Sequence, residues 1–468
     1  MQAKGKFWAA LISILMVLSL ALTACGGSKN EASSSPSASD EGSSSASASP
    51  SESASAAPAE KVTVEFWQTA FEDSTNKWFK KYVDEFNKSQ DKVEIKYTLV
   101  PGDAWAQKLK AAQAAGKAPE VYTMNYGGIA NAAKLGQISP LNGLLPDSAF
   151  DDIYDNVKDF IKVGDKYYAY PKLVEPSAVL YYRKDLFQAA GLDPEKPPTT
   201  WAELLDDAKK LTAKGVFGFS TAQVAGDLGW SSWGLQFGTS GHQAVTNYWS
   251  KADINNDAYK SVFKFYQDAY QSGVMPKQQL APYPDIKPFG EGKVAMQVNG
   301  SWAIGQLRNT YAKMVPNTGI AKMPSMNGDP NSPTATLGGW TLVVDSKGKH
   351  QQEAASFINY LLAGDPAIMI DFFKTSGFSK FSPRKSVDEA MKSDADASKD
   401  AWRAYIAEKI IPTSVAEPIY PWDISMAVST GIESAMKGTK VDDAIAKAEK
   451  TINDFITNNK LAGTNPKQ

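Results

Sequence analysis

Side chains that commonly perform catalysis are scarce in this sequence. Its 468 residues contain one cysteine, Cys25, and two histidines, His242 and His350. One cysteine excludes an intrachain disulfide framework and a zinc site built from several thiolates. The sequence contains no Gly-x-Ser-x-Gly elbow, Walker A loop or dinucleotide fingerprint. Because acidic residues are plentiful, a carboxylate pair for glycoside hydrolysis stays open as an alternative. We nevertheless predict a protein that is not an enzyme and has no catalytic residues.

One acidic stretch begins like a calcium-binding loop. Asp394, Asp396, Ser398 and Asp400 alternate as the first ligands of such a loop do. However, Lys399 stands where the loop needs a glycine, and the twelfth position is not the bidentate glutamate. We interpret the cluster as the start of a helix, and we expect no metal and no cofactor.

Aromatic and amide side chains offer a different chemistry, the binding of a ligand. The chain has 12 tryptophans, 19 tyrosines and 20 phenylalanines, and a surplus of aromatic rings fills cores or lines a cleft. Gln68 and Glu72 follow one predicted strand, and Asn125 and Tyr126 follow another. Open α/β sheets present ligand groups at the ends of their parallel strands. These four residues are therefore candidates for ligand binding.

The pattern of apolar residues predicts the elements that must position these side chains. Alternation over 62–66 and 93–99 predicts two strands, and 121–124 predicts a third. Helical spacing over 79–86 separates the first two. Thr200 to Glu203 forms a capping box that opens another helix. Strands that alternate with helices indicate α/β architecture with a largely parallel sheet.

The length and charge of the chain narrow its class. About 400 residues follow the first sixty, which is too many for one hydrophobic core and predicts two lobes. The formal net charge is −2, so neither nucleic acid nor a membrane surface is an expected partner of the body. Further helices are predicted in the C-terminal third, over 350–362, 399–411, 422–437 and 441–458.

The N-terminus resembles a bacterial lipoprotein signal. Lys4 and Lys6 precede an apolar run from Phe7 to Leu22, and Leu22-Thr23-Ala24-Cys25 fits the lipobox pattern. The resemblance implies a signal peptide at 1–24 that is cleaved before Cys25, and lipidation of that cysteine. A retained membrane anchor is the alternative reading.

Residues 25–60 combine this cysteine with a segment rich in serine and alanine. From residue 28 to 59 the segment has no aromatic and no large aliphatic side chain, so it cannot bury apolar surface. We expect a disordered tether that holds the body at the outer face of the cytoplasmic membrane, in a Gram-positive cell.

Residues 61 to about 460 resemble the extracellular solute-binding proteins of ABC importers, in the sugar-binding group that includes maltose-binding protein. Several stretches carry the resemblance in the expected order. They are VTVEFWQT, LKAAQAAGKAPEVYTMN, AAKLGQISPL, GDKYYAYPKLVEPSAVLYYRKDLFQAAGLD, PPTTWAELLDDAKKL, FGEGKVAMQVNGSW, LGGWTLVV, SGFSKFSPRKSV and VDDAIAKAEKTINDFI. One departure from the family pattern is Arg183, where an asparagine is usual.

The resemblance implies two α/β lobes joined by a hinge with three crossovers, and a ligand cleft between them. Lobe one is expected at 61–173 plus 338–392, and lobe two at 175–336 plus 394–463. The crossovers are expected near Leu173–Glu175, Ala335–Leu337 and Met391–Asp394.

The implied function is a monomeric carbohydrate receptor that delivers a sugar, expected to be an oligosaccharide, to the membrane permease subunits of an ABC importer. Three alternatives stay open: a peptide, polyamine or phosphorylated ligand, a secreted polysaccharide hydrolase, and a cell-wall structural protein. A polyamine site would need an acidic, aromatic box, and a phosphate site would need an arginine fork or a helix N-terminus.

The resemblance also implies which residues hold the ligand. Aromatic faces bind the apolar faces of a sugar, and polar groups bind its hydroxyls. The expected ligand-binding residues, besides the four at strand ends, are Trp302, Trp340, Trp422, Glu175, Trp230 and Trp233.

Overall fold

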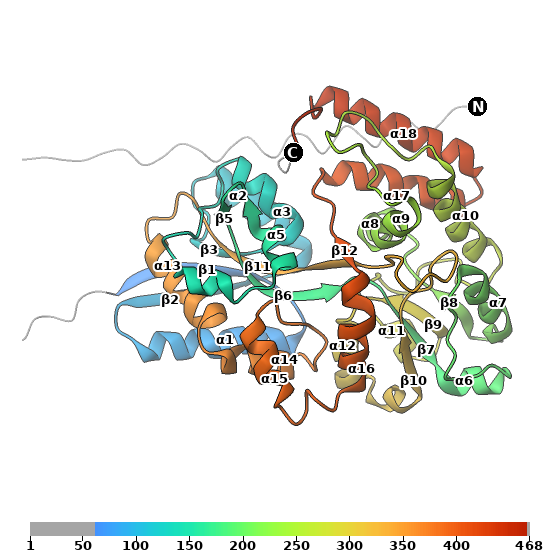
Figure 1. Ribbon diagram of the computed structural model, residues 1–468, viewed down its shortest axis with the longest axis horizontal. Helices are drawn as coiled ribbons and strands as arrows, with labels where there is room; N and C mark the ends of the chain where they lie inside the picture. Colours follow the sequence, from blue (N-terminus) through green and yellow to red (C-terminus); the bar gives the residue numbers. More distant parts are fainter. Residues whose placement is uncertain (1–60, 466–468) are drawn as a thin grey trace, which may run out of the picture. The chain divides into compact units, whose positions relative to one another are not determined.

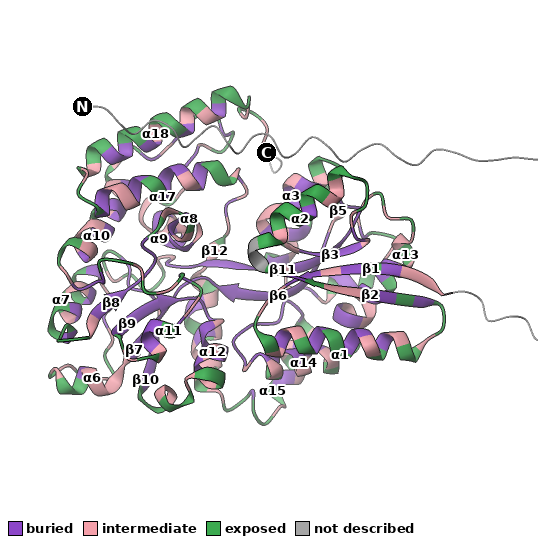
Figure 2. Ribbon diagram, turned by 180° about the vertical axis from the view of Figure 1, so that it is seen from behind, coloured by how far each residue is buried: buried purple, intermediate pink, exposed green. Residues whose placement is uncertain are grey.

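The computed structural model describes residues 61–465. The predicted signal peptide at 1–24, the lipidation site Cys25 and the tether at 25–60 lie outside the described residues. In the described part, helices cover two β-sheets (Figure 1). The strands are largely buried, and the helices expose their outer faces to solvent (Figure 2). The two sheets with their helices form two α/β lobes.

The first sheet has the strand order β12-β11-β3-β1-β2, and β6 pairs with β11 beside this path. Its strands are β1 (Val62–Thr69), β2 (Val93–Val100), β3 (Val121–Asn125), β6 (Tyr170–Pro176), β11 (Thr336–Val344) and β12 (Val415–Ala416). β1 is parallel to both β2 and β3. Val64 and Phe66 face the core because alternate side chains of a strand point to one side. The strands predicted over 62–66, 93–99 and 121–124 are confirmed.

The second sheet has the order β10-β7-β9-β8. Its strands are β7 (Val179–Arg183), β8 (Phe217–Ser220), β9 (Val294–Asn299) and β10 (Thr318–Ala321). β7 runs antiparallel to both neighbours, whereas β8 and β9 are parallel. A short hairpin, β4 (Lys162–Val163) with β5 (Lys166–Tyr167), completes the described strands.

Two antiparallel strands, β6 and β11, run from the first sheet toward the second (Figure 1). β6 ends at Pro176, and β7 of the second sheet begins three residues later at Val179. Within the pair, Glu175 of β6 lies opposite Gly338 of β11. The two strands therefore bring one carboxylate and one glycine together where the lobes meet.

The helices of the first half of the chain alternate with its strands, as the pattern predicts. They are α1 (Asp73–Ser89), α2 (Gly102–Ala114), α3 (Tyr126–Lys134), α4 (Asp147–Asp151), α5 (Asp155–Ile161), α6 (Lys184–Ala189), α7 (Trp201–Leu211), α8 (Ala225–Ser231), α9 (Trp233–Ser240) and α10 (Asp257–Gln271). The capping box at Thr200 and Glu203 is confirmed, since each side chain bonds the backbone of the other.

The remaining helices follow from the C-terminal pattern. They are α11 (Lys287–Gly290), α12 (Ala303–Thr310), η1 (Ala312–Asn317), α13 (Gln351–Ile358), η2 (Asn359–Ala363), α14 (Pro366–Thr375), α15 (Lys385–Lys392), α16 (Ala401–Tyr405), η3 (Ile406–Ile410), η4 (Ile411–Thr413), α17 (Trp422–Met436) and α18 (Val441–Asn458). The predicted helices over 350–362 and 399–411 each continue from an α-helix into a π-helical turn. Over residues 61–465, no helix combines the length and apolarity that crossing a membrane requires.

Candidate functional site

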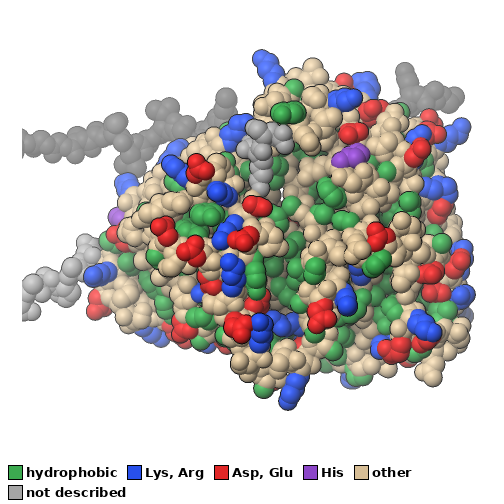
Figure 3. All heavy atoms as spheres, in the orientation of Figure 1, with side chains coloured by type: hydrophobic (Ala, Val, Ile, Leu, Met, Phe, Trp, Pro, Cys, Tyr) green, Lys and Arg blue, Asp and Glu red, His purple; other side chains and the backbone are tan. Residues whose placement is uncertain are grey.

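A cavity of about 1470 Å³ lies between the two lobes. The space-filling view shows hydrophobic side chains in the furrow between the lobes, with acidic and basic side chains along its rim (Figure 3). The cavity is larger than the 300–1,000 Å³ or so of a pocket for a drug-sized molecule. Its size suits a ligand of several sugar rings or a compound of similar extent.

Two tryptophans of the second lobe form one wall of the cavity. Trp230 on α8 and Trp302 before α12 have ring centroids 5.8 Å apart. Tyr283 packs edge-on against Trp230, with centroids 5.0 Å apart. The Trp302 indole donates a hydrogen bond to the Pro284 carbonyl at 3.1 Å. The ring lies so close to Gly300 that a β-carbon there would be 2.0 Å from it. Glycine at that position is therefore what admits the ring.

A second pair of tryptophans comes from α9 and α17. Trp233 and Trp422 meet edge-to-face with centroids 6.2 Å apart. The Trp233 indole donates to the Ser425 hydroxyl at 3.0 Å, which fixes its orientation. Trp422 is 45% exposed although it is large and apolar. A large apolar ring exposed on a cavity wall is typical of a ligand-binding surface.

The first lobe contributes a third aromatic pair. Phe71, which follows β1, packs edge-on against Trp340 of β11 at 5.3 Å. Behind Phe71 lies the fully buried Lys172, whose ammonium nitrogen is 4.3 Å from the phenyl centroid. Burial holds the pKa of Lys172 well below its ordinary value. Aromatic pairs thus line the cavity from both lobes.

Two glutamates meet at the end of the crossing strands. Glu175 is only 9% exposed, and its Oε2 has no hydrogen-bond partner among the described residues. Glu417, just after β12, holds its Oε1 directly over Gly338, where a β-carbon would be 2.2 Å away. Burial raises the pKa of Glu175 to about 7, with Lys380 opposing this shift and Glu72 adding to it. Burial and the charge of Glu175 likewise raise the pKa of Glu417 to about 7.

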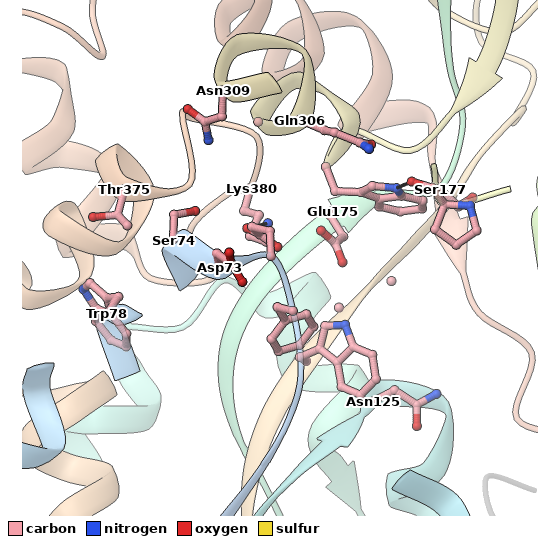
Figure 4. Close-up of a pocket in the computed structure, with 18 of the residues that line it drawn as sticks. Asp73, Ser74, Trp78, Asn125, Glu175, Ser177, Gln306, Asn309, Thr375 and Lys380 are labelled. Carbon is pink, nitrogen blue, oxygen red and sulfur yellow. Dashed lines mark hydrogen bonds and ion pairs between the residues drawn. The ribbon is translucent and has the colours of Figure 1, made fainter. Parts of the chain in front are cut away.

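Two ion pairs line the cavity on the side of α1. Lys380 donates to Glu72 Oε1 at 2.6 Å, and Lys81 pairs with Asp371 at 3.0 Å. Although burial opposes ionisation of Glu72, Lys380 and the hydrogen bond from Thr75 lower its pKa. Figure 4 shows Glu175 next to Lys380, with Asp73 and Ser74 beyond it. Glu72 and Asp371 therefore have cationic partners, whereas Glu175 and Glu417 form no ion pair among the described residues.

The structure brings most of the predicted site residues to this cavity. The residues that line it are Trp302, Trp340, Trp422, Glu175, Trp230, Trp233, Asn125 and Glu72. Gln68 and Tyr126 do not line it. The Gln68 amide bonds Thr69 and Thr123 inside the sheet, and the Tyr126 hydroxyl donates to the Leu173 carbonyl at 3.0 Å.

Sequence reasoning missed other polar residues of the cavity. These include Ser177, Gln306, Asn309, Lys380 and Glu417. Gln306 and Asn309 lie on α12 and border the cavity in Figure 4. Glu417 follows β12, a strand of only two residues, so the strand-end signal that selected Asn125 was absent there. Gln306 lies on the helix that begins just after Trp302. Its place one turn along that helix from a predicted ligand-binding tryptophan was the sequence signal available for it.

The arrangement suits binding of a polyhydroxylated or amine-bearing molecule. Aromatic faces accept apolar C–H surfaces, while carboxylates and amides accept and donate hydrogen bonds. Among residues 61–465, no three histidine, cysteine or acidic side chains are grouped so that they could hold a metal ion. Arg384 donates hydrogen bonds to the carbonyls of Leu362 and Gly364 and so braces that loop.

Residues 72–365 match the model of a known family, described as bacterial extracellular solute-binding protein. The sn-glycerol-3-phosphate-binding periplasmic protein UgpB of Yersinia pestis bv. Antiqua is 29% identical over 346 residues, which is 67% of this chain and 73% of that protein. A mannitol-binding protein of Pseudomonas aeruginosa is 28% identical over 233 residues, 48% of this chain and 52% of that protein.

Solved structures share the fold. The cyclic alpha-maltosyl-1,6-maltose binding protein of Arthrobacter globiformis aligns with a TM-score of 0.68 and 26% identity, over 85% of this chain and 100% of that chain. A solute-binding protein of Thermotoga lettingae, bound with alpha-D-tagatose, aligns with a TM-score of 0.73 and 23% identity, over the same shares. The predicted two-lobed α/β fold is confirmed, and these relatives are binding proteins rather than enzymes. This chain belongs to the family of bacterial extracellular solute-binding proteins.

Proposed function

We propose that the chain is a carbohydrate receptor that binds a sugar, an oligosaccharide of several rings, and delivers it to the permease of an ABC importer. The observation that carries this proposal is a group of five tryptophans, Trp230, Trp233, Trp302, Trp340 and Trp422, that line one cavity from both lobes together with the more deeply buried Trp78. Sugar rings stack on such faces, and a ligand that contacts both lobes favours their closed arrangement over the open one.

The position of the cavity supports the expected division of the chain. Lobe one then takes residues 61–173 and 338–392, and lobe two takes 175–336 and 394–463. Ligand residues come from both parts, since Trp340 falls in lobe one and Trp302 in lobe two. Closure around a hinge at the crossing strands would bring these two rings to opposite faces of the ligand.

A phosphorylated ligand is the second candidate, because the relative from Yersinia pestis is named for binding sn-glycerol 3-phosphate. Lys77 and Lys81 line the cavity and carry positive charge. No arginine stands among the described residues that line it, so a bidentate guanidinium contact to phosphate is not available there. The aromatic pairs and the two glutamates favour a carbohydrate over a phosphorylated ligand, because carboxylates repel a phosphate group.

The anchor belongs to the same proposal. Lipidation at Cys25, after removal of residues 1–24, would hold the receptor at the outer face of the cytoplasmic membrane in a Gram-positive cell. Residues 25–60 would be the tether, and the receptor would work as a monomer beside its permease. Metabolic labelling with a palmitate analogue, lost in Cys25→Ala, tests this part alone.

A thermal-shift panel tests the ligand class. A ligand that binds only the folded state raises the melting temperature as its concentration exceeds the dissociation constant. Mono- and oligosaccharides are compared with peptides, spermidine and sn-glycerol 3-phosphate, and saccharides that bind are checked for release of reducing ends. A rise of several degrees with an intact saccharide supports the proposal. A response to sn-glycerol 3-phosphate alone contradicts it.

A further inference from the structure

The carboxyl groups of Glu175 and Glu417 are an unmatched acid pair inside the cavity. Gly338 is next to both residues. It lies opposite Glu175 in the strand pairing, and the Glu417 carboxylate covers its α-carbon. Glu175 comes from β6, whereas Glu417 follows β12, so the backbone fixes both positions. Their side chains line the same cavity as the tryptophans named above.

The protein supplies little to compensate these carboxylates. Oε2 of Glu175 is buried and has no hydrogen-bond partner in the described chain. Within residues 61–465, no side chain or backbone group donates a hydrogen bond to the Glu417 carboxylate, and no cation pairs with it. An unpaired buried carboxylate is costly, and two close together are more costly still. Both side chains line the cavity, so a ligand can reach them.

The charged and titratable groups that face the pair come from several elements. Lys380 and Lys172 lower the pKa of Glu175, Glu72 raises it, and Lys380 is itself bonded to Glu72. Glu417 faces Glu175, and both carboxylates add to the effect of burial in raising the pKa of Tyr126 on α3. The ammonium group of Lys380 is bonded to Glu72, and no cation acts on Glu417 among the described residues.

We propose that the ligand carries a protonated amine, and that this amine is held between the carboxylates of Glu175 and Glu417 within the tryptophan-lined cavity. The inference rests on the proposed function and narrows it to an amine-bearing saccharide. An ammonium group donates several hydrogen bonds and neutralises a charge that a sugar hydroxyl leaves in place. Tryptophan faces attract a cation in addition, so the aromatic walls and the acid pair select the same group.

The pair also makes the binding sensitive to pH. The carboxylates must lose their protons to hold an ammonium, and they titrate near neutrality. Affinity for an alkyl amine therefore falls as the pH drops below 7, by about tenfold per pH unit for each proton that must leave. A neutral sugar that accepts or donates ordinary hydrogen bonds has no such dependence.

Isothermal titration calorimetry with matched probes tests the inference at pH 6 and pH 8. The probes are maltotriose, 6-amino-6-deoxymaltotriose, kanamycin A, spermidine and sn-glycerol 3-phosphate. We expect an amine-bearing saccharide to bind at least tenfold more tightly than maltotriose at pH 8. Its affinity should fall at pH 6 by about tenfold for each of the two carboxylates that must lose a proton. Glu175→Gln and Glu417→Gln should each abolish the preference, whereas Glu94→Gln, at an exposed position of β2, should retain it.

The outcomes separate this inference from the proposed function. Equal binding of maltotriose and its amine at both pH values overturns the amine site and leaves the sugar receptor intact. Binding of spermidine alone, lost in Glu417→Gln, supports the cation site and overturns the sugar receptor. Binding of sn-glycerol 3-phosphate alone overturns both, and failure of every amine-bearing probe to bind overturns the amine site. Gly338→Ala is a second variant, because its β-carbon displaces the Glu417 carboxylate without removing a charge.

Discussion

Lys380 Nζ lies 2.6 Å from Glu72 Oε1, and this ion pair joins the segment after α14 to the start of α1. The Lys380 side chain is only 2% exposed, whereas 39% of the Glu72 side chain is exposed. The pair therefore orders the α1 wall of the cavity while one partner stays in contact with solvent. Its strength should depend on whether Glu72 is ionised.

Glu72→Gln should lower the stability of the fold at neutral pH. It leaves a nearly buried ammonium without its carboxylate, and we expect a loss of about 1–2 kcal/mol after allowance for the exposure of Glu72. The pKa of Glu72 is lowered in the folded state, so the contribution is present above its ordinary value of 4.5 and is lost as the pH falls through the folded pKa. Chemical denaturation at pH 7 and pH 3 measures both effects. A stability difference from wild type that is as large at pH 3 as at pH 7 would contradict this role of the ion pair. Asp84→Asn, on the exposed surface of α1, is the control.

Lys172→Met should stabilise the protein. Its ammonium nitrogen is buried and has no hydrogen-bond partner among the described residues, and burial lowers its pKa well below 10.5. The unfolded chain then binds a proton that the folded chain does not, so stability rises with pH up to about the ordinary lysine pKa. Methionine removes the cost of burying the amine. We expect the free energy of unfolding to rise by about 1–3 kcal/mol at pH 7, and by less toward pH 10. Urea denaturation at both pH values is the measurement, and Lys96→Met, at an exposed position, is the control. A loss of stability of Lys172→Met at pH 7 would show that the buried amine stabilises the fold.

Gly300→Ala should weaken ligand binding by turning Trp302. The new β-carbon would meet the indole ring at 2.0 Å, so the ring must leave its place beside Trp230. We expect about a tenfold loss of saccharide affinity and a loss of about 1–3 kcal/mol in stability from the overpacking. Gly226→Ala is the matched control, since nothing lies within 4 Å of a β-carbon there. If both alanine variants bind equally well by calorimetry, Trp302 does not contact the ligand.

Glu175→Gln and Glu417→Gln should raise the melting temperature at high pH. Each folded-state pKa is raised from 4.5 to about 7, so the folded chain takes up protons in that window and its stability falls as the pH rises through it. The variants remove this cost, and their melting temperatures should exceed that of wild type by a few degrees at pH 8 and by less at pH 5. Differential scanning calorimetry decides it, and a difference that does not change with pH would show that the pair carries no charge.

Much of the fold could be predicted from local pattern, because strand alternation and helix caps depend on residues that are close in the sequence. The strand over 62–66 and the capping box at Thr200 are examples. The same alternation could have excluded Gln68, which has the parity of Val64 and Phe66 and therefore points into the core. Tryptophans such as Trp302 were found through the family resemblance.

Glu417 could not be found in this way. Its strand, β12, has only two residues, and it pairs with Thr336 and Leu337, which lie about 80 residues earlier. So short a strand leaves no periodic signal, and a long-range pairing is set by the packing of both lobes. The approach of Glu417 to Gly338 is likewise a tertiary fact that no local pattern contains.

The central claim is that the tryptophan-lined cavity binds a saccharide, and calorimetric titration of Trp302→Ala with the saccharide that most raises the melting temperature tests it most directly. The account predicts a loss of about 10- to 100-fold in affinity, about 1.4–2.8 kcal/mol, with an unchanged fold. Tyr248→Ala, which removes an aromatic ring that is 62% exposed outside the cavity, should bind as wild type does. Wild-type affinity in Trp302→Ala would contradict the account.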